Sequence, residues 1–573
     1  MRLACFVLLV SVNASAAEYW FRPSGGSYGS EDGSDYANAK DGLSGVTATI
    51  GDNDTIHVCG THREMLVIVE EGVTVDLACS ANADPARLYG TDVDSGTGWT
   101  LVNGEYQKTF ALSSGGPTVA VHDGEILELG TIGSLQTGQW ACGPVAQQRA
   151  ASNGVTSCYN ATGSSDFTVY VKDDPTQGTW EFGARSFGIL IGPTSDTTGV
   201  ATITVNGGGT AKILYQGCAG TAATAGKYCN KPNGRGIAAY NDAYTRTNWD
   251  NGAWTINGVI FIGQGEQAIH LNGTDATTGT TPDRIDIIDS EFYNQGGEAI
   301  YLKAVGDGTD GIINVVGNTV GSSTYDQAGW GSEGVACSAF DGDGIDIGPG
   351  TTDTQTINVV GNSISHIRGN GISVAGGGAV RITDNTVNTI NNRQDSCTKA
   401  AINVATLTAE DQAYSDNNLT PVYGDGFKVY GNANAGVDYV FTGNCMNIGS
   451  AYAGVRSMDA NWARNFKFYG NRFLGGTYGI YWGNPAQNID GNVINNNSFV
   501  GMTYPLYESQ GTTQLSGNGN IFVDFTSFLV GNASYASVSA LEAAQSSFTN
   551  NGAGQGIPYC GSTRAPPRRM RRQ

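Results

Sequence analysis

The chain has 573 residues, of which 83 are glycine and only 15 are proline, and charged residues make up 14%. Its formal net charge of −22 argues against nucleic acid as a partner, because a phosphate-binding surface needs a basic footprint. Runs of helix-forming residues are nearly absent, so the composition indicates a β-rich and turn-rich fold rather than a helical one.

Residues 1–17 have the features of a secretory signal peptide. An arginine precedes an apolar run from Leu3 to Val12, and small residues follow that run. A membrane anchor would need a longer apolar run, and no later segment is long and apolar enough to cross a bilayer. We therefore expect a secreted or periplasmic protein without stable membrane insertion.

The cysteines fit export into an oxidising compartment. Loss of Cys5 with the signal peptide would leave ten of the eleven cysteines, an even number that favours disulfides. No CxxC pair occurs, which argues against a zinc site. Connectivity stays open, but the nearest pairs along the chain are Cys59/Cys79, Cys142/Cys158 and Cys218/Cys229.

A repeated motif runs through the second half of the chain. Each copy has alternating apolar and polar residues, then a turn with asparagine, then a second short strand. The turn residues are Asn318, Asn362, Asn385, Asn444, Asn471 and Asn497. Asn418 is expected to supply a turn in the one wide gap. Asparagine tolerates left-handed backbone and can bond to the same residue one repeat away, so we expect a stacked asparagine ladder.

The spacing of the repeats predicts a parallel β-solenoid, since three short strands fit in each unit. Helix-pair repeats would need a 3.6-residue period, which is missing. A sandwich or propeller is the competing fold. The predicted organisation is one β-helix domain over 18–561, with loop insertions near 321–340 and 388–400. Residues 562–573 are expected to form a basic, disordered tail, and the chain is expected to be a monomer.

The repeated GNxΦ turns resemble those of the pectate-lyase-like superfamily. The segment YWFRPSGGSYGS, followed by GDNDTIHVCGTHREML, is similar to the entry segment of many such proteins. This resemblance implies an all-β, right-handed parallel β-helix with a short N-terminal capping helix. It implies little about activity, because this fold hosts many functions.

A second element, of the form small-Φ-x-Φ, follows each asparagine turn. The copies are AIHL, AIYL, GIDI, GISV, AINV, GFKV, GVRS and GIYW. If the Φ residues fill the core, the x residues point outward and stack in one column, one coil apart. The column is His270, Tyr301, Asp346, Ser373, Asn403, Lys428, Arg456 and Tyr481. Earlier strands offer only Leu190 and Ala238 at this position.

Polar residues just before these strands are expected to line one rim of the column. They are Glu266, Glu298, Asp341, Asp343, Asn370, Lys399, Asp425 and Tyr478. The two predicted insertions enter the same rim, and each carries one cysteine. A disulfide between Cys337 and Cys397 would brace the wall of a groove.

The leading functional hypothesis is a polysaccharide lyase that cleaves an acidic, uronate-containing polysaccharide by β-elimination. This reaction needs carboxylate neutralisation, a base and an acid. Lys428 would be the base, with Arg456 on the next coil and Tyr301 as acids. The expected substrate-binding residues are Asn403, Ser373, Tyr481, Glu298, Arg368 and Tyr478. No organic cofactor is expected.

Calcium could neutralise the substrate carboxylate. Asp341, Asp343 and Asp346 lie close together in sequence and offer oxygen ligands, which calcium prefers. A tight turn at Asp341-Gly-Asp343 is the simpler interpretation of the same residues.

The placement of Lys428 and Arg456 is similar to that in polysaccharide lyase family six. In that family a lysine base and an arginine acid lie on neighbouring coils, often with calcium. The stretch GDGFKVYG also resembles the segment around the catalytic lysine of polysaccharide lyase family nine, with only a loose parallel to that family's calcium aspartates in DGDGIDI. The two resemblances agree on Lys428 and differ on its partner.

Two other functions stay open. A β-helix glycoside hydrolase needs carboxylates near one bond, and Asp346 with Asp343 and Glu298 could serve, with His270 nearby. The chain lacks the complete N-T-D, D-D, G-H-G and R-I-K set of polygalacturonases. A non-catalytic carbohydrate-binding or surface β-helix is the third possibility, and an epimerase is a minor one.

Overall fold

The computed structural model describes most of the chain. The described residues are 16–111, 119–130, 132–143, 166–192, 202–216, 234–239, 252–265, 267–272, 283–303, 311–321, 342–348, 355–367, 369–390, 399–405, 412–421, 423–430, 437–458, 465–482, 491–508, 515–531 and 533–553.

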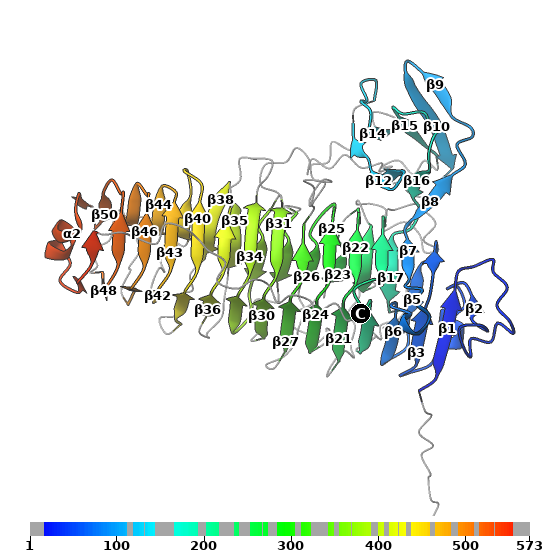
Figure 1. Cartoon of the computed structure of the whole chain (residues 1–573), viewed down its shortest axis with the longest axis horizontal. Helices are drawn as coiled ribbons and strands as arrows, with labels where there is room; N and C mark the ends of the chain where they lie inside the picture. Colours follow the sequence, from blue (N-terminus) through cyan, green and yellow to red (C-terminus); the bar gives the residue numbers. More distant parts are fainter. Residues whose placement is uncertain are drawn as a thin grey trace, which may run out of the picture.

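Three sheets of 14 strands each run the length of the molecule (Figure 1). Successive strands visit sheet I, sheet III and sheet II in turn, and each strand pairs in parallel with its counterpart in the next coil, except for the antiparallel pair β50 and β51 at the end of sheet II. The expected all-β, right-handed parallel β-helix is confirmed.

The strands of sheet I, in spatial order, are β2 (Lys40–Asp41), β1 (Glu18–Arg22), β3 (Thr55–Val58), β6 (Val73–Asp76), β18 (Ile203–Asn206), β21 (Ala253–Asn257), β24 (Arg284–Ile288), β27 (Ile312–Val316), β30 (Thr356–Val360), β33 (Val380–Thr383), β36 (Gln412–Ser415), β39 (Tyr439–Thr442), β42 (Phe466–Tyr469) and β45 (Val493–Asn495).

Those of sheet II are β5 (Leu66–Ile68), β17 (Phe187–Ile191), β20 (Arg235–Ala239), β23 (Ile269–Asn272), β26 (Ile300–Lys303), β29 (Ile345–Gly348), β32 (Ile372–Ala375), β35 (Lys399–Ala405), β38 (Gly424–Val429), β41 (Ala453–Ser457), β44 (Tyr478–Trp482), β47 (Tyr504–Glu508), β50 (Phe528–Val530) and β51 (Ala533–Tyr535).

Those of sheet III are β4 (Thr61–His62), β7 (Arg87–Tyr89), β19 (Lys212–Leu214), β22 (Ile260–Ile262), β25 (Glu291–Tyr293), β28 (Thr319–Val320), β31 (Ser363–Ile367), β34 (Thr386–Ile390), β37 (Asn418–Thr420), β40 (Cys445–Ile448), β43 (Arg472–Gly475), β46 (Ser498–Val500), β49 (Ile521–Val523) and β53 (Gly552–Ala553).

The core lies between the three sheets because apolar residues alternate with polar ones along each strand. In β27, Ile313 and Val315 are fully buried while the residues between them stay partly exposed. Burial of one such side chain contributes about 1.5–3 kcal/mol. The inner positions form one continuous cluster from Phe21 to Phe548, so every coil packs on the next.

Short helices occur near both ends of the β-helix. The expected N-terminal capping helix is α1 (Val46–Thr49), a single turn that buries Val46 in the core. The helix α2 (Val538–Ala544) was not predicted. The Ser537 side chain caps it by accepting a hydrogen bond from the backbone N–H of Ala540 at 3.2 Å.

An asparagine ladder runs along the corner between sheets I and III. In each step, the side-chain oxygen of one asparagine accepts hydrogen bonds from the backbone and side-chain nitrogens of the preceding member. Its members are Asn318, Asn362, Asn385, Asn417, Asn444, Asn471, Asn497, Asn520 and Asn551. The ladder is confirmed, but the expected turn residue Asn418 is wrong. Asn417 takes the buried position, and Asn418 begins β37.

Residues between Thr91 and Gly183 form an insertion that was not predicted. Figure 1 shows it projecting from the N-terminal coils. Its two mainly antiparallel sheets enclose a core of their own, with Trp140 and Trp180 buried. The strands are β8 (Thr91–Asp94), β9 (Thr100–Val102), β10 (Glu105–Ala111), β11 (Ala120–His122), β12 (Glu125–Ile126), β13 (Glu128–Leu129), β14 (Gln139–Gly143), β15 (Asp166–Val171) and β16 (Trp180–Gly183).

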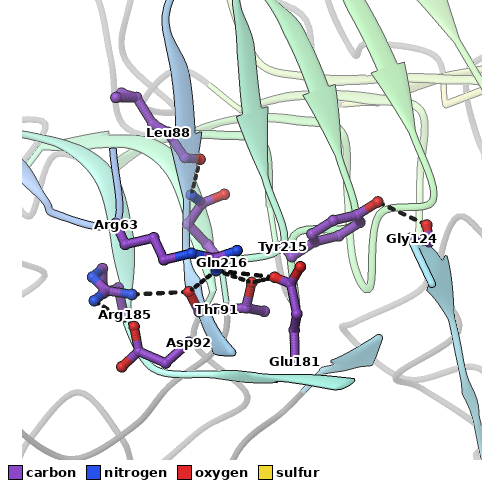
Figure 2. Close-up of polar contacts among 9 residues, drawn as sticks. All are labelled: Arg63, Leu88, Thr91, Asp92, Gly124, Glu181, Arg185, Tyr215 and Gln216. Carbon is purple, nitrogen blue, oxygen red and sulfur yellow. Dashed lines mark hydrogen bonds and ion pairs between the residues drawn. The ribbon is translucent and has the colours of Figure 1, made fainter. Parts of the chain in front are cut away.

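Ionic contacts fix this insertion to the β-helix (Figure 2). Nη1 of Arg63 lies 3.0 Å from Oε2 of Glu181 and 2.6 Å from the Thr91 carbonyl oxygen. The Thr91 hydroxyl donates to the same carboxylate at 2.5 Å. Arg185 binds the Thr91 carbonyl from the other side and pairs with Asp92 at 2.7 Å. Two arginines of the β-helix therefore hold the chain where it enters and leaves the insertion.

An apolar contact completes the junction. Val121 and Ile126 of the insertion pack with Leu214, the last residue of β19 in sheet III, and with Tyr215, which follows it. The Tyr215 hydroxyl donates to the Gly124 carbonyl oxygen at 2.9 Å (Figure 2). Burial raises the pKa of Tyr215, so this hydroxyl stays a donor. The insertion thus sits on the N-terminal coils.

The structure tests some of the cysteine predictions. Cys59 and Cys79 form a disulfide, with their Cα atoms 5.4 Å apart. Cys445 is disulfide-bonded as well. The other predicted pairs involve residues outside the described part, including Cys158, Cys337 and Cys397.

Across the described ranges, no helix is long and apolar enough to span a membrane.

Candidate functional site

The predicted column exists on the outer face of sheet II. Residue pairing between neighbouring strands puts its members in one line, in the predicted order. The pairs are His270–Tyr301, Tyr301–Asp346, Asp346–Ser373, Ser373–Asn403, Asn403–Lys428, Lys428–Arg456 and Arg456–Tyr481. No register slip occurs at Lys428, which is half-buried on the outer face.

The column extends beyond both ends of the predicted set. Tyr481 pairs with Tyr507 on the next coil, a residue that was missed because Pro505 interrupts the small-Φ-x-Φ pattern. In the other direction, Leu190 and Ala238 pair with each other and Ala238 pairs with His270. Both apolar residues are buried. The polar column therefore begins at His270.

Most of the described residues that were expected on the rim are buried. Their exposed fractions are 3% for Glu298, 7% for Asp343, 9% for Asn370, 4% for Lys399 and 0% for Asp425. Tyr478 is half-buried. Glu266, Asp341 and Arg368 lie outside the described residues. Glu298 is therefore buried at the rim, and its role in substrate binding stays a prediction.

The burial has a structural reason. At the corner that leads into sheet II, the polar side chain of one coil accepts a hydrogen bond from the backbone N–H of the next. Asp343 accepts from Asn370 at 2.6 Å, and Asn370 accepts from Ala400 at 2.9 Å. Asp425 accepts from Ala453 at 2.7 Å. These side chains satisfy the backbone at the corner, which the sequence pattern did not reveal.

Three carboxyl groups on two adjacent coils form what we call the acidic segment: Glu298, Asp343 and Asp346. Glu298 accepts a hydrogen bond from Gln267 Nε2 at 2.8 Å. Burial, and to a smaller extent the charges of Asp346 and Asp343, raise the pKa of Glu298 to about 8, although the Gln267 bond opposes this. Glu298 is therefore protonated at neutral pH.

Asp346 has a different environment, because Lys303 reaches it from the preceding coil. Lys303 Nζ lies 2.6 Å from Asp346 Oδ1 and 5.4 Å from the centre of the Tyr301 ring. His270 and Tyr301 stack with their ring centres 4.9 Å apart. Lys303 was missed as a site residue because it follows AIYL, after the last core position. It forms an ion pair with Asp346 beside two stacked rings.

The cationic segment, Lys428 and Arg456, lies further along the same column. Arg456 Nε and Nη2 donate to the two oxygens of buried Asp425 at 2.6 and 3.1 Å. Burial lowers the pKa of Arg456, but the hydrogen bonds and charge of Asp425 outweigh it and the net pKa is raised. Arg456 is therefore a fixed cation, and the expectation that it acts as a proton-donating acid is not supported by its environment.

Lys428 differs from Arg456 in its contacts. Among the residues that the structure describes, no hydrogen bond or ion pair involves its ammonium group, which lies 5.5 Å from the centre of the Tyr430 ring. Asn403 and Ser373 separate Lys428 from the acidic segment, and Asn403 Nδ2 donates to Ser373 Oγ at 3.4 Å. The column thus carries an acidic and a cationic part with polar residues between them.

The column ends in four half-buried tyrosines, the tyrosine cluster: Tyr478, Tyr481, Tyr504 and Tyr507. Their ring centres lie 4.7–5.8 Å apart. The guanidinium of Arg456 stacks on the Tyr481 ring at 4.7 Å. Burial and the neighbouring tyrosines raise the pKa of Tyr478 and of Tyr507, so these hydroxyls stay protonated.

The predicted calcium ligands do not converge on one site in the described part of the chain. No group of three or more His, Cys, Asp or Glu side chains there has the arrangement of a metal site. Asp343 bonds to Asn370, and Asp346 pairs with Lys303. Asp341 lies outside the described residues, so the three-aspartate site stays a prediction.

No protein-family model matches the chain, and no curated protein matches its sequence. The resemblances to polysaccharide lyase families six and nine therefore stay predictions. Three solved structures show what the chain is similar to in shape. XylC bound to xylose aligns with a TM-score of 0.32 and 12% identity, over 89% of this chain and 70% of that one.

The other two are family GH87 α-1,3-glucanases. The catalytic unit of the enzyme from Streptomyces thermodiastaticus strain HF3-3 has a TM-score of 0.36 and 11% identity, over 73% of this chain and 89% of that one. A GH87 catalytic domain in complex with tetrasaccharides has a TM-score of 0.18 and 11% identity, over 81% and 96% of the two chains. All three TM-scores are below 0.5, so these similarities carry no inference about substrate or mechanism.

Proposed function

We propose that the chain is a polysaccharide-degrading enzyme, and specifically a glycoside hydrolase that uses the acidic segment. The observation that supports this most is the contrast between two carboxyl groups on adjacent coils. Glu298 has a pKa of about 8, while Asp346 is ion-paired with Lys303. Hydrolysis of a glycosidic bond needs a protonated carboxyl and an ionised one.

The proposed roles follow from these environments. Glu298 donates its proton to the leaving glycosidic oxygen, and Asp346 activates a water molecule or attacks the anomeric carbon. In either case one water molecule is consumed. Its hydroxyl group goes to the anomeric carbon, and its remaining proton replaces the one that Glu298 gave to the leaving oxygen, after transfer from Asp346 where Asp346 is the base. Since Glu298 is only 3% exposed, it must rotate toward Asp346 on the outer face to reach a bound sugar.

Tyr301, which is half-buried, provides the adjoining sugar-binding surface, and His270, which is only 4% exposed, supports the Tyr301 ring by stacking. Their stacked rings lie on the same side of sheet II as Asp346, one coil apart from each other. Aromatic rings offer an apolar face and a polar edge, which suits a sugar ring. Lys303 keeps Asp346 oriented from the same coil as Tyr301.

A lyase is the second candidate, favoured by Lys428. Its ammonium group faces outward beside Arg456, and no ion pair to a described residue engages it. Lys428 would remove the C5 proton of a uronate, Arg456 would neutralise the carboxylate, and Tyr481 would donate a proton to the leaving oxygen. The raised pKa of Arg456 leaves the acid role to a tyrosine in this scheme.

One screen separates these functions. Alginate, pectate, chondroitin and neutral glucans are incubated with the protein, with and without a chelator. A hydrolase releases reducing ends without ultraviolet absorbance, whereas a lyase creates an unsaturated product that absorbs. Binding without cleavage would favour the carbohydrate-binding β-helix instead. Loss of activity with chelator would support calcium, and N-terminal sequencing of the exported protein would test the signal peptide.

A further inference from the structure

The tyrosine cluster has a feature that packing alone does not require. None of its four hydroxyl groups makes a hydrogen bond to any described residue, although all four side chains are half-buried. Some other half-buried tyrosine hydroxyls do have partners in the protein: Tyr28 donates to a backbone carbonyl oxygen at 2.8 Å. A tyrosine pairs its apolar ring with a polar hydroxyl, and four such hydroxyls gathered at one place are open to an external ligand.

The four rings stack in two pairs, so the ring edges that carry the hydroxyl groups form the available surface. Tyr481 stacks with Tyr507 at 5.0 Å and an interplanar angle of 14°, and Tyr478 stacks with Tyr504 at 5.8 Å and 16°. The two stacks lie side by side, with the rings of Tyr478 and Tyr481 4.7 Å apart. The cluster therefore offers four phenol groups, each a donor and an acceptor, on a rigid apolar base.

Arg456 fixes one end of the cluster. Its guanidinium stacks on Tyr481 while buried Asp425 holds it through two hydrogen bonds. Since Asp425 offsets the charge of Arg456, the cluster itself has little excess positive charge to attract a polyanion, and Lys428 lies one coil beyond Arg456. A ligand rich in hydroxyl groups with apolar C–H faces matches it better. Saccharides have this chemistry.

We propose that the tyrosine cluster is a distal subsite that binds a polysaccharide chain. Five coil steps separate Asp346 from Tyr481, and at about 4.8 Å per step the two lie roughly 24 Å apart along the column. A chain of several sugar residues spans this distance, but a mono- or disaccharide does not. The inference rests on the proposed function only for the direction of the chain toward the acidic segment.

Binding tests this proposal without requiring hydrolysis. Tyr481→Phe with Tyr507→Phe keeps both ring stacks and removes two hydroxyls. Because one hydrogen bond contributes about 0.5–1.5 kcal/mol, each lost hydroxyl should weaken binding about two- to tenfold. Binding is measured by affinity electrophoresis in gels containing pectate or a neutral glucan. Tyr469→Phe, a half-buried tyrosine on the outer face of sheet I, is the matched control and should bind as the native chain does.

The length of the saccharide ligand provides a second test of the proposal. A polymer should lose affinity in the double variant, while a disaccharide of the same sugar should bind equally weakly to both proteins. Unchanged polymer binding with unchanged thermal stability would overturn the proposal. It would also be overturned if none of the polysaccharide gels slowed the migration of the native protein. If retardation depends on the two hydroxyls but no bond is cleaved, the subsite stands and the proposed hydrolase does not.

Discussion

The acidic and cationic segments belong to the same sheet, but their buried corner carboxyl groups have opposite kinds of neighbour on the next coil. Buried Asp425 meets Arg456 on the next coil and forms a two-bond ion pair. Buried Glu298 occupies the equivalent corner position, but the next coil supplies Asp346 and Asp343. A corner carboxyl therefore forms an ion pair where the next coil offers a cation, as Asp425 does, and has its pKa raised where the next coil offers further acids, as Glu298 does.

Glu298→Gln should have the largest effect. If Glu298 is the proton donor, activity on the identified polysaccharide should fall by about 10²–10⁴, because glutamine cannot donate a proton to the leaving group. Folding should survive, since the native carboxyl is already neutral at pH 7. Reducing-end release measures the rate. Glu508→Gln is the matched control, a buried glutamate at the end of β47, and retained activity in Glu298→Gln would contradict the assignment.

The pH dependence of activity and of stability tests whether the pKa of Glu298 is raised. With a pKa of about 8, Glu298 loses its proton as the pH rises through 8, so activity should decline on the alkaline side. The stability of the folded chain should also decline as the pH rises. The unfolded carboxyl titrates near 4.5, so the native chain loses stability relative to Glu298→Gln as the pH rises from about 4.5 to 8. Denaturation midpoints of the two proteins at pH 5 and pH 8 test this; a constant difference would show that Glu298 is not shifted.

Lys428→Ala should have a smaller effect on activity than Glu298→Gln. In a hydrolase the lysine contributes to substrate binding at most, and we expect less than about a tenfold loss, in the range of one or two hydrogen bonds. Lys212→Ala changes a partly buried lysine on sheet III and controls for loss of a cation. Complete loss of activity in Lys428→Ala, with Glu298→Gln active, would transfer the chemistry to the cationic segment and support the lyase.

Asn417→Ala should change stability while leaving both segments intact. Asn417 accepts two hydrogen bonds from Asn385 and donates to Ile382 and Asn444. Leaving buried partners unsatisfied costs about 1–3 kcal/mol. The neighbouring Asn418→Ala should cost less than about 1 kcal/mol. Denaturant unfolding of the two variants gives the comparison, and equal losses would place Asn418 in the ladder after all.

Much of this architecture could be predicted because the coil repeats. Alternation along each strand gave the outward direction of Lys428, and the repeat gave its neighbours Asn403 and Arg456. The ladder followed from the asparagine turns. One misplacement arose where two adjacent asparagines, Asn417 and Asn418, fit the same pattern, because sequence alone does not say which one turns inward.

The remainder depends on contacts that no repeat encodes. The corner carboxyls, such as Glu298 and Asp425, were expected on the rim, but their burial could not be predicted because strand alternation does not apply where the chain bends. The partner of Asp346 is Lys303, which lies 43 positions away in sequence. The insertion between Thr91 and Gly183 lacks the asparagine turns, so the repeat pattern gave no signal for it.

The products of digestion test the central claim most directly. The native chain and Glu298→Gln are incubated with each polysaccharide, and reducing ends and ultraviolet absorbance are recorded together. The account predicts reducing ends without the absorbance of an unsaturated sugar, and their loss in Glu298→Gln. Products that absorb, formed equally by both proteins and abolished by Lys428→Ala, would contradict it.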